Sequence, residues 1–137
     1  MIVSRSEFLD RLRSRISEEE RGALQNDDGV LISRYNRATL LRMLNDDESK
    51  AGTVDTERAD ALEKALEAYL SRYMAENPEG HKWIILSCLY CSQVEGEPMH
   101  PREVAGWRRE GSDYFCRARE DVPGNVCLWC VCQPDPL

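Results

Sequence analysis

Apolar residues recur at helical intervals through the first part of the chain. Within residues 4–24 they fall on one face of a helix, and Ser4 stands three positions before Glu7, which is the spacing of a capping box. The pattern predicts a first helix that begins at this box and ends near the QNDDG turn. Its apolar face consists of Phe8, Leu9, Leu12 and Ile16.

Two further stretches show the same period. Residues 33–47 and residues 55–76 each predict a helix, and the sequence NPEG ends the second of them. We expect the apolar stripes to pack together as the core of a small antiparallel helical bundle. The stripes are Tyr35, Leu40, Leu41 and Leu44 in one helix and Leu62, Leu66, Tyr69, Leu70 and Tyr73 in the other.

The segment HKWIILSCLYCSQVEGEPMHP, residues 81–101, fits two structures. As a strand leading into Cys88-Leu-Tyr-Cys91, it resembles the entry to a thioredoxin-like redox motif. A helix is favoured because three predicted helices precede it without strand–helix alternation. The two cysteines then occupy neighbouring positions of one face, where they are small buried hydrophobes, metal ligands or a redox pair. The apolar stripe of this helix consists of Trp83, Leu86, Tyr90 and Val94.

The chain changes character near residue 96. Residues 97–137 are rich in glycine, proline and charge, and they contain too few apolar side chains to order the segment by themselves. A chain of 137 residues has the size of one domain. We therefore predict a mainly α single domain, residues 1–137, in which a Cys-rich, metal-stabilised irregular segment (97–137) packs on a helical bundle (1–96).

Four of the six cysteines lie in the seventeen residues CRAREDVPGNVCLWCVC, which predicts a metal site. Zinc often takes two ligands from a Cys-x-x-Cys turn, and Cys127 and Cys130 provide one directly after a Pro-Gly-Asn turn. Cys116, eleven residues upstream of Cys127, adds a third thiolate. The fourth ligand is His100, whose neutral imidazole limits the negative charge of the site, or alternatively Cys132. An iron–sulfur cluster held by the four cysteines is the alternative to Zn²⁺.

Net charge and the lengths of the apolar runs limit the kinds of partner that we expect. The net charge is −7, and acidic residues exceed basic ones on both sides of residue 80, so the surface repels phosphate backbones and nucleic acid is an unlikely partner. The N-terminus lacks the apolar core of a signal peptide, and the longest apolar run is about half a membrane span. We expect a cytoplasmic protein with no membrane segment. In a reducing compartment, clustered cysteines more often bind metal or carry out redox chemistry than form disulfides.

Several local sequences resemble an uncharacterised archaeal family, found chiefly in methanogens, known as domain of unknown function family 2115. The resemblance covers about residues 81–132 and consists of a His-Pro pair after an apolar helix, DYFC, EDVPGN and CLWC. It implies a fold pattern and a metal site, and it implies no reaction. The family's motif residues fall here on His100, Pro101, Cys116, Cys127 and Cys130.

No hydrolase, nucleotide-binding or zinc-protease motif such as G-x-S-x-G, a P-loop or H-E-x-x-H occurs in the sequence. Three thiolates also make zinc a poor Lewis acid, so the sequence disfavours an enzymatic function for this protein. The sequence favours a zinc-stabilised helical module that binds an unidentified protein partner or has a regulatory role. The alternatives are an iron–sulfur or thiol redox protein, and a metal-dependent enzyme that uses Glu103 or Glu120.

Overall fold

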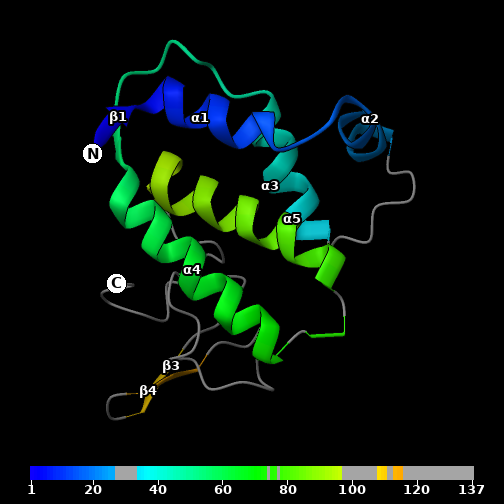
Figure 1. Ribbon diagram of the computed structural model, residues 1–137, viewed down its shortest axis with the longest axis vertical. Coiled ribbons are helices and arrows are strands. Elements are labelled where there is room, and N and C mark those ends of the chain that lie inside the picture. Colours follow the sequence, from blue (N-terminus) through cyan, green and yellow to red (C-terminus); the bar gives the residue numbers. More distant parts are fainter. Residues whose placement is uncertain (27–33, 74, 77, 97–107, 111–112, 116–137) are drawn as a thin grey trace.

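The computed structural model describes residues 1–26, 34–73, 75–76, 78–96, 108–110 and 113–115 (Figure 1). At residues 34–35, 73, 108–110 and 113–115 it describes the backbone alone. The fold is mainly helical, as predicted. In chain order its elements are β1 (Ile2–Ser4), α1 (Arg5–Ser14), α2 (Glu18–Asn26), α3 (Arg34–Leu44), β2 (Thr53–Asp55), α4 (Thr56–Tyr73), α5 (Pro78–Leu89), the π-helix η1 (Tyr90–Glu95), β3 (Arg108–Glu110) and β4 (Asp113–Phe115).

The first predicted helix is two helices, α1 and α2. Ser4 caps α1 as expected, since its hydroxyl accepts a hydrogen bond from the Glu7 N–H at 3.1 Å. A second capping box follows at Ser17, whose hydroxyl accepts from the Glu20 N–H at 3.1 Å while the Glu20 carboxylate accepts from the Ser17 N–H at 3.0 Å. The second box starts a new helix in a different direction, so continuous helical periodicity concealed a break.

The buried face of α3 is partly different from the predicted one. Leu40 is buried as expected, whereas Leu41 and Leu44 are only partly buried. The true stripe follows helical spacing but contains two polar side chains, and this is why a search for apolar periodicity missed it. It consists of Asn36, Thr39, Leu40 and Met43.

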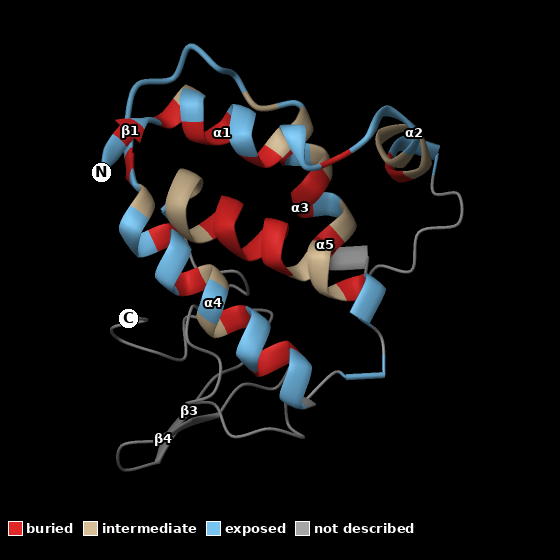
Figure 2. Cartoon of the chain, viewed as in Figure 1, coloured by how far each residue is buried: buried red, intermediate tan, exposed pale blue. Residues whose placement is uncertain are grey.

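The central element of the bundle is α5, which with η1 lies among α1, α3 and α4 (Figure 1). Every residue from Ile85 to Cys91 is buried, so this stretch of α5 and η1 is enclosed on all sides (Figure 2). The helical interpretation of this segment is therefore confirmed, and the strand interpretation is wrong. The predicted stripe of α4 is confirmed at Leu62, Leu66, Tyr69 and Leu70, while the side chain of Tyr73 lies outside the described part.

Two short antiparallel strand pairs complete the described structure. β1 pairs with β2 in the register Ile2↔Asp55, Val3↔Val54 and Ser4↔Thr53, and the two valines are buried. This pairing places the start of α1 beside the start of α4. β3 pairs with β4 in antiparallel fashion, with Arg109 opposite Tyr114, so part of the segment expected to be irregular is paired strand. None of the described helices combines the length and apolar character that a membrane span requires.

Candidate functional site

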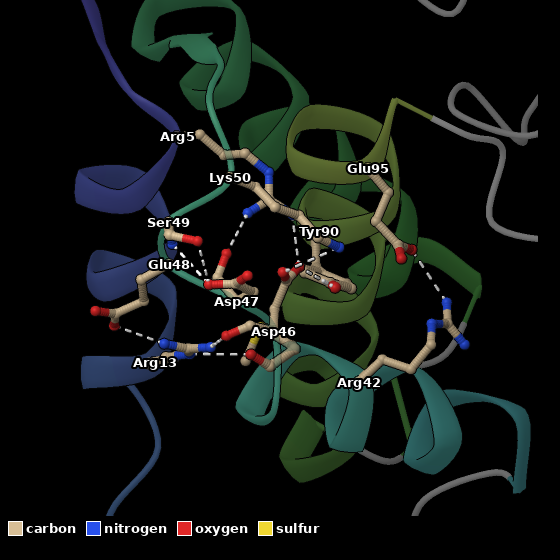
Figure 3. Close-up of polar contacts among 11 residues, drawn as sticks. Arg5, Arg13, Arg42, Asp46, Asp47, Glu48, Ser49, Lys50, Tyr90 and Glu95 are labelled. Carbon is tan, nitrogen blue, oxygen red and sulfur yellow. Dashed lines mark hydrogen bonds and ion pairs between the residues drawn. The ribbon is translucent and has the colours of Figure 1, made fainter.

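A cluster of buried polar side chains lies where α1 begins, α3 ends and η1 begins (Figure 3). Arg5 is the first residue of α1, and its backbone N–H donates to the Gly52 carbonyl at 2.9 Å. Asp46 follows the last residue of α3 by two positions, and Tyr90 is the first residue of η1. Three segments far apart in sequence thus each contribute one side chain.

Asp46 is the centre of this cluster. Its Oδ2 atom lies 2.6 Å from Nη2 of Arg5 and 2.5 Å from the hydroxyl oxygen of Tyr90, which donates to it. The Lys50 ammonium lies 3.7 Å from Oδ1. The side chains of Asp46 and Arg5 are only 3% and 9% exposed, so this is a buried ion pair completed by a phenol. A buried charge requires such partners because it has lost its hydration.

The protonation states of the cluster follow from these contacts. Burial alone would raise the pKa of Asp46, but the hydrogen bonds from Arg5 and Tyr90 outweigh it and hold the pKa below its ordinary value. Burial, followed by the bond to Asp46, raises the pKa of the Tyr90 phenol well above its ordinary value. At neutral pH the carboxylate is ionised and the phenol is protonated. Neither group is suited to act as a general base or a nucleophile, so the arrangement favours a structural connection over catalysis.

Arg13 reinforces the end of α3 beside this cluster. Its guanidinium donates to the backbone carbonyls of Met43 at 2.9 Å and Asp46 at 2.6 Å, and it pairs with Glu48 at 2.7 Å. The last carbonyls of a helix have no partner within the helix, and a cation there also interacts favourably with the helix dipole. The segment that carries Asp46 is therefore fixed by α1 at two points.

A second polar group connects the far end of η1 to α3. Nη2 of Arg42 lies 3.1 Å from Oε1 of Glu95 and 3.9 Å from Sγ of Cys91 (the Arg42–Glu95 pair is drawn in Figure 3). The hydrogen bond to Glu95 raises the pKa of Arg42. Burial, with the nearby Glu95 carboxylate, raises the pKa of the Cys91 thiol to about 11. The thiol is therefore protonated at neutral pH.

The two cysteines of the Cys-x-x-Cys sequence are buried in the central helix, with exposed fractions of 0% for Cys88 and 2% for Cys91. A redox-active cysteine pair needs an accessible thiol with a lowered pKa. Cys91 has the opposite properties, which favours a packing role for this thiol. Within the described residues, no three His, Cys, Asp or Glu side chains are grouped so as to hold a metal ion.

The predicted metal ligands, His100, Cys116, Cys127 and Cys130, and the alternative ligand Cys132 lie outside the described residues. The described strand β4 ends at Phe115, directly before Cys116. Zinc binding by these residues stays a prediction.

Sequence reasoning missed Arg5 and Asp46. Both are charged residues at helix ends, where charge is ordinary and usually solvated. One signal was present at Arg5, which stands between the buried residues Val3 and Phe8 in a stretch with a capped helix start. No local signal marks Asp46, because three acidic residues follow one another there and only the fold selects one of them.

The described part of the chain is thus a helical domain with a buried ionic cluster, followed in sequence by a cysteine-rich segment. It belongs to the archaeal family described as "Uncharacterized protein conserved in archaea (DUF2115)", which it matches over residues 4–135. The predicted family is confirmed, and the match extends beyond residues 81–132 to the N-terminal helices.

A curated relative is UPF0305 protein MK0666 of Methanopyrus kandleri, which is 33% identical over 78 residues. The match covers 47% of this chain and 55% of the relative, so it spans about half of the relative's length. No solved structure matches the chain.

Proposed function

We propose that this protein is a zinc-stabilised helical module that acts through a protein partner or in regulation. The observation that carries the proposal is the division of the cysteines into two groups. Cys88 and Cys91 are buried in α5 and η1, which favours a packing role. The remaining four, with His100, are concentrated in the segment after the bundle, and this concentration is typical of a structural zinc site.

The ligand set that we propose is His100, Cys116, Cys127 and Cys130, with Cys132 as the alternative to His100. Three thiolates and one imidazole complete a tetrahedral site and leave no open position for a substrate. The zinc would then supply folding free energy to a segment with few apolar side chains, rather than catalysis. A partner of protein character is favoured over nucleic acid because the net charge is −7.

Metal content and an absorption spectrum test the proposal. Full-length protein purified without oxygen should contain about one zinc per chain, as expected for a single tetrahedral site, and should be colourless. A brown protein that contains iron and absorbs visible light would replace zinc with an iron–sulfur cluster. Protein with neither metal, even after refolding with added zinc under reducing conditions, would contradict the proposal.

Single substitutions assign the ligands. Cys116→Ser, Cys127→Ser and Cys130→Ser should each abolish stoichiometric zinc, and their effects should not add because each destroys the same site. Cys91→Ala is the matched control, since it removes a buried thiol outside the proposed site and should retain the metal. His100→Ala and Cys132→Ala then identify the fourth ligand, because only loss of a true ligand should release zinc.

Chelation tests the role of the metal. With zinc removed, far-UV circular dichroism should decrease only in part, because the helices have their own core, while residues 97–137 become sensitive to protease. Proteins that associate with the zinc-loaded chain and not with Cys127→Ser would be candidate partners. Complete loss of helical signal on chelation would show instead that the metal holds the whole domain together.

A further inference from the structure

α5 continues directly into a π-helix, η1, which is an uncommon conformation for six consecutive residues. The π-helix pairs each N–H with the carbonyl five residues before it. It occurs mostly as single-turn insertions and is frequent at functional sites. Sparsely populated backbone conformations persist where surrounding contacts hold them. The contacts that hold η1 in this conformation are therefore the place to look for its role.

Two side chains of η1 five positions apart contact α3 and the residues that directly follow it (Figure 3). Tyr90 donates to Asp46 at 2.5 Å, and Glu95 accepts from Arg42 at 3.1 Å. In an α-helix, residues five apart point about 140° away from each other. In a π-helix they lie about one turn apart on one side. The two contacts with the α3 segment are thus compatible with π geometry and conflict with α geometry.

The backbone of this region is adapted to the π register. The Ser92 hydroxyl donates to the Cys88 carbonyl at 2.7 Å, and so supplies a partner to a carbonyl in the turn where the register changes. The Gly96 N–H donates to the carbonyl of Cys91, five residues back. Gly96 has φ 71°, a left-handed conformation that glycine adopts without strain, and it ends the helix there.

We propose that η1 is a conformational latch: the Tyr90–Asp46 and Glu95–Arg42 contacts hold its π register, and their release converts the segment to α-helix. A change from five-residue to four-residue pairing rotates the end of η1, including Gly96, relative to α3 and α1. The cysteine-rich segment follows Gly96 in sequence, so we expect the latch to be coupled to it, and this second step rests on the zinc site proposed above.

The two contacts differ in burial and chemistry. Substitutions in each can therefore distinguish a latch from a cluster that only stabilises the fold. Tyr90 is buried and belongs to the Arg5–Asp46 cluster, whereas the side chain of Glu95 is 24% exposed and pairs with a half-exposed arginine. If the cluster only stabilises the fold, Tyr90→Phe should lower stability and leave the register unchanged, and Glu95→Gln should have little effect of any kind. If the latch exists, both substitutions should shift the same equilibrium.

The register is measured by NMR spectroscopy of the full-length chain. In wild-type protein, amide exchange and nuclear Overhauser contacts in residues 90–96 should follow five-residue pairing. We expect Tyr90→Phe, Glu95→Gln and the double variant to show four-residue pairing in a measurable fraction of molecules. Arg15→Met is the matched control, because it breaks another interhelical ion pair, Arg15–Glu63 at 2.8 Å, away from η1. Unchanged five-residue pairing in folded Glu95→Gln and Tyr90→Phe would overturn the latch.

The coupling is measured by competition with a zinc chelator. Apparent affinity falls in proportion to the fraction of molecules in the binding-competent arrangement. A double variant with about nine-tenths of its molecules in the four-residue register should therefore bind zinc roughly tenfold more weakly than wild type, and one with about half should bind roughly twofold more weakly, with Arg15→Met unchanged. Equal affinity despite a changed register would overturn the coupling alone. If wild-type protein takes up no zinc, the proposed function fails and the coupling fails with it, while the NMR measurement still decides the latch.

Discussion

Arg5 and Asp46 are buried charges, and each is stabilised in the fold by the other as its counter-ion. Taking two ions out of water costs several kcal/mol each, and their attraction compensates only with good geometry and further hydrogen bonds. The 2.6 Å contact and the phenol of Tyr90 provide both. Loss of one partner is therefore much more damaging than the net contribution of the intact pair, because the remaining charge stays buried.

Asp46→Asn should lower the free energy of unfolding by about 3–5 kcal/mol, since it leaves the Arg5 guanidinium without a counter-ion. Urea denaturation followed by circular dichroism measures the change. Glu63→Gln is the matched control, because it breaks the more exposed Arg15–Glu63 pair and should cost about 1 kcal/mol or less. Similar losses in the two variants would contradict the burial argument.

The lowered pKa of Asp46 predicts an acid-sensitive contribution to stability. The group binds its proton more weakly in the folded state than in the unfolded state, where its pKa is near the ordinary value of 3.8. Its contribution is therefore complete above that value and is lost as the pH falls through the folded-state pKa. The stability difference between wild type and Asp46→Asn should shrink below about pH 4, as measured by urea titrations from pH 7 to pH 2. A difference that stays constant would contradict this assignment.

At the scale of single elements, α2 depends on its capping box. Ser17→Ala removes the acceptor for the Glu20 N–H and should lower stability by about 1 kcal/mol. Amide hydrogen exchange should show the loss first in residues 18–26. Ser14→Ala is the control, because the Ser14 hydroxyl bonds back to the Arg11 carbonyl within the helix, where such a bond adds little. Faster exchange in α2 for both variants would count against the capping role.

The burial of Cys88 in α5 and Cys91 in η1 predicts that neither cysteine reacts in the native state. A short pulse of iodoacetamide should leave Cys88 and Cys91 unmodified, because both are enclosed and burial raises the pKa of Cys91 to about 11. Trypsin cleavage releases residues 83–102 as a peptide that contains these two cysteines and no others, so mass spectrometry measures them separately. In denaturant both should be modified. Rapid native labelling would revive the redox interpretation of this pair.

Element by element, the sequence predicts the helices well and their ends less well. The apolar face of α4 and the caps at Ser4 follow from local patterns, and the structure confirms them. The break between α1 and α2 has a local signal in Ser17 and Glu20 that the continuous periodicity concealed. The π-helix has no comparable signal, since its register depends on Arg42 and Asp46, about forty to fifty residues away in sequence. Tertiary contacts select it.

For the whole molecule, the described helices share one hydrophobic core. Buried apolar side chains contributed by segments from Val3 to Tyr90 pack together in it. We therefore expect a fragment of residues 1–96 to fold by itself, with helical circular dichroism and cooperative urea unfolding. The full chain in chelator is the matched control. A fragment that aggregates or unfolds without cooperativity would show that residues 97–137 are needed to complete the core.

The proposed zinc site can be predicted from the sequence, whereas the buried ionic cluster cannot. The proposed zinc ligands, such as Cys127 and Cys130, are recognisable because metal chemistry requires particular residues at close spacing. The ionic cluster is not recognisable in this way, since Arg5, Asp46 and Tyr90 come from three distant segments and each is ordinary in its local context. Only the fold brings them together.

The pairing of β1 with β2 has a consequence for folding during synthesis. β1 is made before β2, and α1, α2 and α3 lie between them, so Val3 has no strand partner until Val54 has left the ribosome. Arg5 likewise has no counter-ion until Asp46 is made, and Asp46 has no phenol partner until Tyr90, the first residue of η1, is made. Domains generally fold as units, and contacts between distant segments form late because their loops must close first. A nascent chain that stalls before Tyr90 thus holds a charged pair without the phenol that completes it, and incompletely folded chains of this kind are one reason that chaperones exist.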